Sequence, residues 1–113
     1  MIKAEFFTAS SGELLGFSIK GHSGSTEAGN DIICAAVSSA AYMTVNTVTD
    51  ILHIDARLAV DDGFLRIHIG EEDARSCRSI FAGFKLHMVG LEEQYPKNIK
   101  VCYTCLLYTS RCV

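Results

Sequence analysis

Residues 15–38 read LGFSIKGHSGSTEAGNDIICAAVS and change their periodicity twice. The first six residues alternate apolar with small or polar side chains, which predicts a half-buried strand. The next ten contain three glycines and few apolar side chains, which predicts a loop. From Ile33 onward, apolar residues recur at every third or fourth position, which predicts a helix that continues to about Leu52. The stretch therefore predicts a strand, a loop and a helix in succession.

The segments on either side of this stretch complete a regular order of elements. A second amphipathic helix is predicted before Pro96, and strands are predicted over residues 2–8, 15–20, 56–60, 64–69 and 98–104. An Asp-Asp-Gly turn joins the third and fourth of these strands. Since each helix has one apolar stripe to bury, we predict an α/β (α+β) two-layer sandwich in the order ββαββα(β), with a mostly antiparallel sheet and two helices on one face.

Length and composition fit one compact domain. The chain has 113 residues, of which 49% are hydrophobic and 20% are charged, so it carries enough apolar residues to build a core and is not a disordered chain. The formal net charge of −3 supplies no basic field for phosphate groups. We therefore expect no direct nucleic-acid partner.

Neither an export signal nor a membrane span is predicted. Lys3 and Glu5 place charges where a signal peptide needs an apolar run, so we expect a cytoplasmic protein. The longest uncharged run, residues 32–49, is long enough to raise the question of a span, but six of its residues are Ser, Thr or Asn. We interpret it as a buried amphipathic helix and expect no membrane partner.

The predicted junction of strand, loop and helix carries the residues of a cysteine nucleophile. His22 follows the strand, and Cys34 is predicted to lie in the first turn of the helix. A helix N-terminus presents free N–H groups and the positive end of the macrodipole, and both stabilise a thiolate. The imidazole can act as a general base, and the same N–H groups can hold the oxyanion of an acyl transfer.

Each of these residues also has a purely structural interpretation. A cysteine beside an Ala-Ala-Val run is commonly a small core residue. Asp31 is most simply a helix N-cap, and Ser38, one turn after Cys34, is most simply a serine bonded back to its own helix. Adjacency at a strand–loop–helix junction, where functional sites commonly form, favours the catalytic interpretation.

The other cysteines and histidines form no comparable pattern. Five cysteines at irregular spacings without an export signal argue against a disulfide framework. Cys102 and Cys105 have metal-ligand spacing but no second pair, so we predict no metal site and no cofactor. A cysteine phosphatase would need an arginine where Ala40 stands. Cys77 is predicted to be a packing residue, and solvated positions are predicted for His53, His68 and His87.

The spacing of these residues resembles that of the ribosomal-processing cysteine protease family, Prp. Gly21-His22 is followed by a glycine-containing loop and then by GNDIICAAVS at residues 29–38, and twelve positions separate His22 from Cys34. The order of elements, and a second helix that ends at a Tyr-Pro pair, are also similar. The resemblance covers roughly residues 1–102.

This resemblance implies a homodimeric bacterial cysteine endopeptidase. Its partner would be the N-terminal leader of large-subunit ribosomal protein twenty-seven, which it would remove during ribosome maturation. Cys34 would be the nucleophile and His22 the general base. The residues that support this pair would be Asp31 and Ser38. The substrate loop that closes over the peptide would contain Gly21, Gly24 and Gly29. Whether Asp31 orients His22 or caps the helix stays open.

The predicted protease domain does not include the end of the chain. The protease domain is predicted to span residues 1–101, and residues 102–113 depart from the family pattern, so we interpret them as an atypical, non-native tail.

The alternative to a protease is a catalytically inactive peptide-binding or ribosome-associated interaction module. Selective alkylation of Cys34 at neutral pH would favour the protease, because an inactive module gives a buried thiol no reason to ionise.

Overall fold

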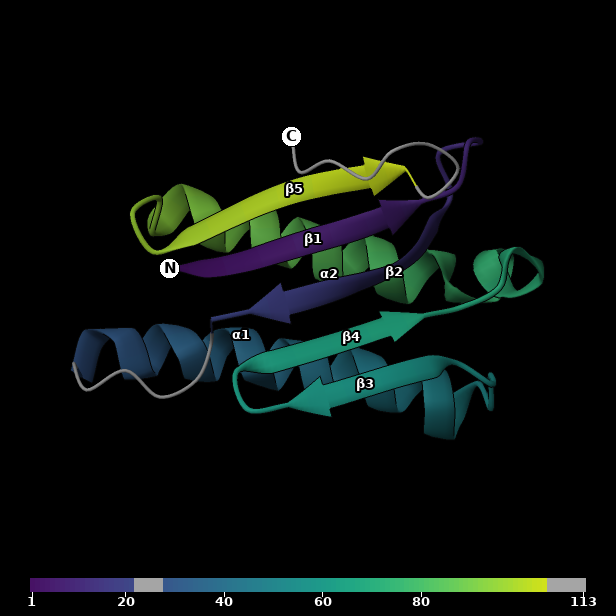
Figure 1. The fold of residues 1–113 in the computed structure, drawn as a ribbon, viewed down its shortest axis with the longest axis horizontal. Helices are drawn as coiled ribbons and strands as arrows, with labels where there is room; N and C mark the ends of the chain where they lie inside the picture. Colours follow the sequence, from purple (N-terminus) through teal and green to yellow (C-terminus); the bar gives the residue numbers. More distant parts are fainter. Residues whose placement is uncertain (22–27, 106–113) are drawn as a thin grey trace.

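The computed structural model describes residues 1–21 and 28–105, with side chains described for 1–21 and 32–105. One sheet in the order β3-β4-β2-β1-β5 contains β1 (Ile2–Thr8), β2 (Leu14–Lys20), β3 (Arg57–Asp61), β4 (Phe64–His68) and β5 (Ile99–Cys105). The helices are α1 (Ala28–Asn46) and α2 (Ala74–Gln94) (Figure 1). A π-helical turn, η1 (Thr47–Ile51), continues α1, and a 3₁₀ turn, η2 (Glu71–Asp73), leads into α2.

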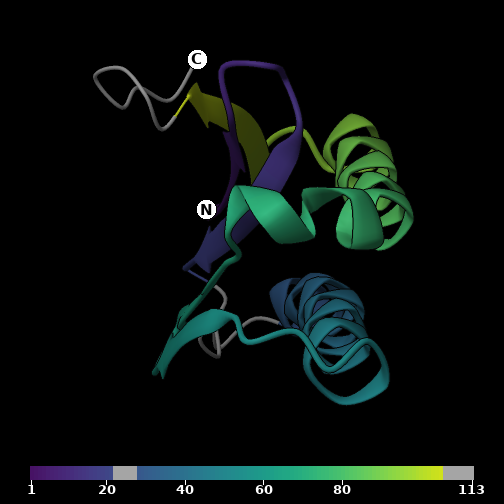
Figure 2. The ribbon, with the colours of Figure 1, turned by 90° about the vertical axis from the view of Figure 1, so that its right-hand side faces the viewer.

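The sheet is mixed and mostly antiparallel, as predicted. β1 pairs antiparallel with β2, β2 with β4, and β4 with β3, whereas β1 and β5 are parallel. Both helices lie on the same face of this sheet (Figure 2). α2 contacts β2 and β5, and α1 lies behind the half of the sheet formed by β4 and β3 (Figures 1 and 2). The predicted two-layer sandwich is therefore confirmed.

The core lies between the sheet and the two helices. Phe17 of β2 is completely buried, and its ring centroid lies 4.3 Å from that of Phe84 and 6.0 Å from that of Phe81, both on α2. Phe6 of β1 joins the same aromatic group, with its centroid 5.8 Å from that of Phe84. α1 and the η1 turn close the other half of the core, α1 through Ile33, Val37, Ala41 and Val45, and η1 through Val48. The alternation in the strands and the three-to-four spacing in the helices thus meet in one apolar layer.

The last strand extends the sheet beyond the predicted limit of the domain. β5 continues to Cys105, and Cys102 and Thr104 are buried within it. Residues 102–105 therefore belong to the sheet. The rest of the predicted tail, residues 106–113, lies outside the described residues.

Within the described residues, one helical stretch is long and apolar enough to cross a membrane. It runs from Ile32 to Ile51, and its mean hydropathy is 1.4. In the structure this stretch packs one face on the sheet, with Val37 and Val48 completely buried. α1 is therefore the core helix of the sandwich in this structure, as the sequence predicts.

Candidate active site

The first helix begins earlier than the sequence predicts. α1 starts at Ala28, so Gly29 and Asn30 are helical and Asp31 is not the N-cap. The low helix propensity of Gly and Asn favours a later start, but such propensities are weak and other interactions readily override them. Cys34 consequently lies in the second turn of α1 and not in the first. The free N–H groups of the helix belong to residues 28–31, one turn before the thiol.

Cys34 is a free thiol on the border between core and solvent. Its side chain is half-buried and packs against the main hydrophobic cluster beside the buried residues of α1. Ser38 follows four positions later and is also half-buried, so it lies one turn further along the same flank of the helix. The predicted pair of Cys34 and Ser38 is therefore brought together on one side of α1.

The opposite flank of α1 faces α2. A cavity of about 640 Å³ between the two helices is lined on the α1 side by residues that include Ala36, Ala40 and Met43, and on the α2 side by residues that include Ile80 and His87. On a helix these α1 residues lie across the buried stripe from Cys34 and Ser38. Cys34 therefore faces away from α2, toward the side of the sheet that ends in β3.

Gly21 fixes the point at which the chain leaves β2 for the predicted loop. Its φ of +82° lies in the left-handed region, and a Cβ built there would approach the Met1 carbonyl oxygen to 2.5 Å. The N–H of Gly21 donates to the carbonyl oxygen of Gly63 in the β3–β4 turn at 2.9 Å. Glycine is required here because both the backbone angle and the close approach exclude a side chain.

We expect Gly21→Ala to destabilise the protein more than Gly12→Ala. Gly12 also has a positive φ, but a Cβ at Gly12 would meet no atom within 4 Å. The backbone strain alone predicts a loss of about 1–2 kcal/mol for Gly12→Ala, and the added contact predicts about 2–4 kcal/mol for Gly21→Ala. Urea unfolding of both variants measures the difference, and equal losses would contradict a tight contact at Gly21.

The remaining predicted site residues are His22, Gly24, Gly29 and Asp31. His22 and Gly24 lie outside the described residues. Gly29 was expected in the loop, but it is the second residue of α1. Asp31 is the fourth residue of α1, which excludes the N-cap role and leaves its relation to His22 a prediction. The structure therefore describes the nucleophile candidate and the glycine that precedes the base candidate.

The other described cysteines differ from Cys34 in their surroundings. Cys77 is completely buried on α2, which confirms its predicted packing role. Burial, with a smaller contribution from the carboxylate of Asp73, raises the pKa of the Cys77 thiol to about 11. Cys105 is a half-buried free thiol, and Cys102 is disulfide-bonded, which departs from the expectation of reduced thiols at that one position.

Alkylation at pH 8 should therefore modify Cys34 far ahead of Cys77. With a pKa of about 11, about one Cys77 thiol in a thousand is ionised at pH 8, and the thiolate is the reactive form. Labelling of Cys77 should rise as the pH approaches 11. Mass spectrometry after a short iodoacetamide pulse measures both sites, and a denatured sample serves as the control in which Cys77 becomes accessible. Equal labelling rates in the folded protein would contradict the burial of Cys77.

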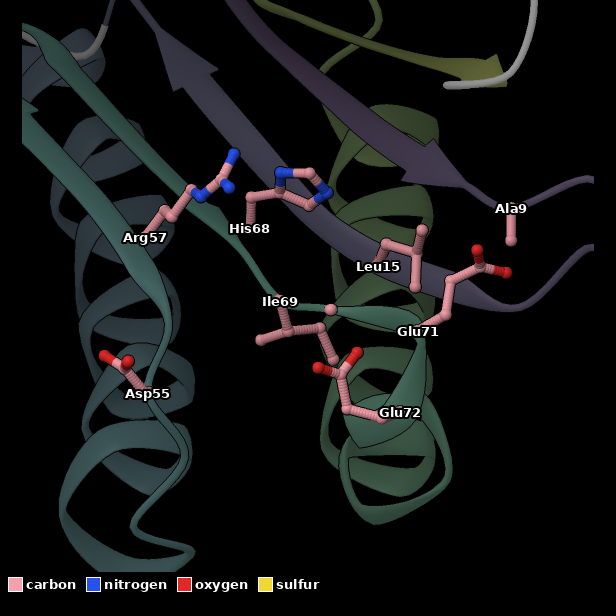
Figure 3. Close-up of a pocket in the computed structure, with 9 residues that line it drawn as sticks. Ala9, Leu15, Asp55, Arg57, His68, Ile69, Glu71 and Glu72 are labelled. Carbon is pink, nitrogen blue, oxygen red and sulfur yellow. The ribbon is translucent and has the colours of Figure 1, made fainter.

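A second cavity lies at the far end of the sheet from the start of α1. Its volume is about 470 Å³, and His68, Arg57 and Asp55 are among its lining residues (Figure 3). His68 is half-buried and not an ordinary solvated residue, so that prediction is wrong. Burial and the nearby guanidinium groups of Arg57 and Arg66 lower the pKa of His68. Cys34 is not among the described residues that line this cavity.

Two residues near the Cys34 side of the sheet were not singled out from the sequence. Leu58 and Val60 of β3 pair with Ile67 and Leu65 of β4, which are buried under the helices, so all four lie on the same face. Leu58 is nevertheless 47% exposed and Val60 54% exposed. The Asp-Asp-Gly turn that follows them predicts a hairpin strand, but no local signal shows that this strand lies at the edge of the sheet.

Solved structures share this fold. The ribosomal processing protease Prp of Staphylococcus aureus, solved in complex with a substrate peptide, has a TM-score of 0.83 at 23% identity, over 92% of this chain and 100% of that chain. SMU.848 from Streptococcus mutans has a TM-score of 0.83 at 30% identity, over 93% of this chain and 95% of that chain. The architecture is therefore one on which a cysteine protease is built.

The sequence comparison gives the family. The model of the family described as cysteine protease Prp matches residues 1–100. A curated relative, the ribosomal processing cysteine protease Prp of Staphylococcus aureus, is 25% identical over 105 aligned positions, and the match covers 91% of this chain and 99% of that protein. The chain belongs to the cysteine protease Prp family, and its enzyme class is that of a cysteine protease.

Proposed function

We propose that this protein removes the N-terminal extension of large-subunit ribosomal protein twenty-seven during ribosome maturation. Cys34 acts as the nucleophile and His22 as the general base. The observation that carries the proposal is the half-buried free thiol of Cys34 on the first helix of a chain that belongs to the Prp family. The curated relative's name, which specifies ribosomal processing, supports the substrate class.

The proposed reaction is an acyl transfer through a thioester. His22 takes the proton of the Cys34 thiol, and the thiolate attacks the carbonyl carbon of the scissile peptide bond. The tetrahedral intermediate collapses as the C–N bond breaks, and the proton held by His22 passes to the departing amine. Water, activated by His22, then attacks the thioester, which releases the new carboxylate and restores the thiol.

The position of Cys34 within α1 sets the side from which the carbonyl approaches. The free N–H groups of residues 28–31 lie one turn before Cys34, toward the start of the helix. A helical side chain leans toward the N-terminus of its own helix, so the thiol points in the direction of these donors. We therefore place the oxyanion on the N-terminal side of the thiol, where these amides can stabilise it. Asp31 and Ser38 support the dyad from the same helix.

The direct test is cleavage of the ribosomal protein itself. The purified protease is incubated with the precursor that carries the N-terminal extension, and the products are read by mass spectrometry. One cut that leaves the mature N-terminus is the expected result. A precursor that stays intact while the protease remains folded would overturn the assignment of this substrate.

We also propose that the enzyme works in the cytoplasm as a homodimer. The resemblance to the Prp family supports the dimer, and the proposed ribosomal substrate supports the location. Light scattering on the purified protein should give twice the 12.3 kDa mass of the chain. A mass of one chain at micromolar concentration would contradict the dimer.

A further inference from the structure

The edge strand β3 is only partly protected against pairing with a further strand. Within the described residues it pairs with β4 on one side and with no strand on the other. Edge strands are commonly protected from further pairing by lysine, proline or a bulge. β3 carries the charged residues Arg57 and Asp61 at its two ends, but it has no lysine and no proline, and between these ends it exposes the apolar side chains of Leu58 and Val60. An apolar open edge of this kind indicates a surface that is used for binding.

The nucleophile lies on the same side of the molecule as this edge. The flank of α1 that carries Ala36, Ala40 and Met43 faces α2. Cys34 and Ser38 lie on the other flank, and α1 lies behind the half of the sheet that ends in β3 (Figures 1 and 2). The thiol and the open strand therefore face the same region of solvent.

The turn that follows β3 is also held next to the end of β2. The hydrogen bond from the N–H of Gly21 to the carbonyl oxygen of Gly63 joins the β3–β4 turn to the residue before His22. α1 begins at this same end of the sheet (Figure 1). A strand that ran along β3 toward the turn would thus arrive at the end of the sheet where the helix that carries Cys34 begins.

We propose that the substrate binds as an extended strand added to the free edge of β3, with alternate apolar side chains resting on Leu58 and Val60 and the scissile carbonyl at Cys34. The inference rests on the proposed function, because it assigns a binding mode to that substrate. Main-chain hydrogen bonds to an edge strand supply affinity for any sequence, and side chains at every second position supply specificity. The two exposed apolar residues have this two-residue spacing.

Two carboxylates at the end of β3 favour a cationic residue in the bound peptide. Asp61 and Asp62 are both exposed, and the N–H of Asp62 donates to Oδ1 of Asp61 at 2.7 Å. In the sequence, both residues lie between Val60 and Gly63, and the carbonyl oxygen of Gly63 accepts the hydrogen bond from Gly21. The site therefore fits a peptide with apolar residues at alternate positions and a cationic residue further along, beside the β3–β4 turn.

The first test separates binding from chemistry by changing the apolar surface. Leu58→Ser and Val60→Ser are compared with Leu86→Ser, a matched control on α2 whose side chain is 74% exposed. The substrate is a peptide that spans the cleavage junction of the ribosomal protein. Its KM should rise about tenfold in each β3 variant, because serine removes the apolar surface that the bound peptide would cover. The kcat should stay within about twofold of wild type, since neither residue touches the reacting atoms. The control should leave both constants unchanged.

The second test probes the strand pairing itself. A series of junction peptides, each with one backbone N–H methylated, should lose cleavage at every second position on the apolar side of the junction, because an added strand turns alternate N–H groups toward β3. Uniform loss, or no loss, together with unchanged KM in the β3 variants, would overturn the binding mode while the proposed function stands.

A wild-type protein that cleaves none of the unmodified peptides would instead overturn the proposed function. β3 variants that become monomeric with unchanged KM would show that a second copy of the chain covers this edge, which also overturns the inference.

Discussion

Replacing Cys34 by alanine is expected to lower kcat for the junction peptide by about 10⁴-fold or more, because the thiolate forms the covalent intermediate. His22→Ala should reduce kcat by a similar factor, since the thiol proton then has no acceptor. The double variant should lose little more than either single variant, because residues that act as one unit give strongly non-additive effects. The structure supports the choice of Cys34 in that it is a free thiol near solvent, whereas Cys77 is enclosed by the core.

Cys105→Ala is the matched control for this series. Cys105 is also a half-buried free thiol, but it lies on β5, at the opposite edge of the sheet from β3. Its replacement should leave kcat unchanged, and circular dichroism should show that every variant retains the wild-type fold. Loss of activity in Cys105→Ala with full activity in Cys34→Ala would move the nucleophile to another element. A loss of less than tenfold in His22→Ala would remove the general base from this histidine.

The elements of the fold were predictable because their causes are local. The alternation at Phe17 and Ile19 places both side chains on one face of β2, and both are buried. Pro96 cannot continue a helix, and α2 ends at Gln94. The two predicted strands around the Asp-Asp-Gly turn lie within one residue of β3 and β4. In each case the deciding interaction lies within a few residues of the sequence pattern.

Features that depend on contacts across the whole chain were not predictable in this way. The parallel pairing of β1 with β5 joins Ile2 to Ile99, and no local pattern specifies such a partner. The open edge at β3 follows from the same long-range order of strands. The predicted start of α1 is wrong because helix propensities near Gly29 differ by no more than about 1 kcal/mol, which tertiary contacts outweigh. The burial of His68 comes from the surrounding strands and turns, which its own segment does not reveal.

The candidate site shows the same division between local and distant causes. The pattern of residues from Gly21 to Ser38 identified the family and the thiol, and the structure places Cys34 and Ser38 on one flank of α1. The surface that this flank faces could not be predicted, because Leu58 and Val60 are distant in sequence and become exposed only when their strand stands at an edge. The proposed nucleophile and the proposed binding surface are thus encoded in separate parts of the sequence, and the order of the strands brings them to one side of the molecule.

The second large effect is expected in the core, at Phe17. Phe17→Ala should destabilise the protein by about 3–5 kcal/mol, because it removes a completely buried ring and leaves a cavity. Phe17 is where the sheet meets α2, since its ring contacts Phe81 and Phe84 on the helix and lies 6.0 Å from Phe6 on β1. The free energy of unfolding of a domain of this kind is about 5–15 kcal/mol, so the expected loss is a large part of it.

Urea unfolding measures this loss, and Phe7→Ala is the matched control. Phe7 is the neighbour of Phe6 on β1, but it is half-buried on the opposite face, near the ring of His68. Its replacement should cost about half as much or less, since less apolar surface returns to water. A smaller loss at Phe17 than at Phe7 would contradict the position of the core. The catalytic consequence differs from that of Cys34→Ala: an unfolded fraction lowers the concentration of active enzyme and leaves KM unchanged, whereas loss of the thiol removes the chemistry from every folded molecule.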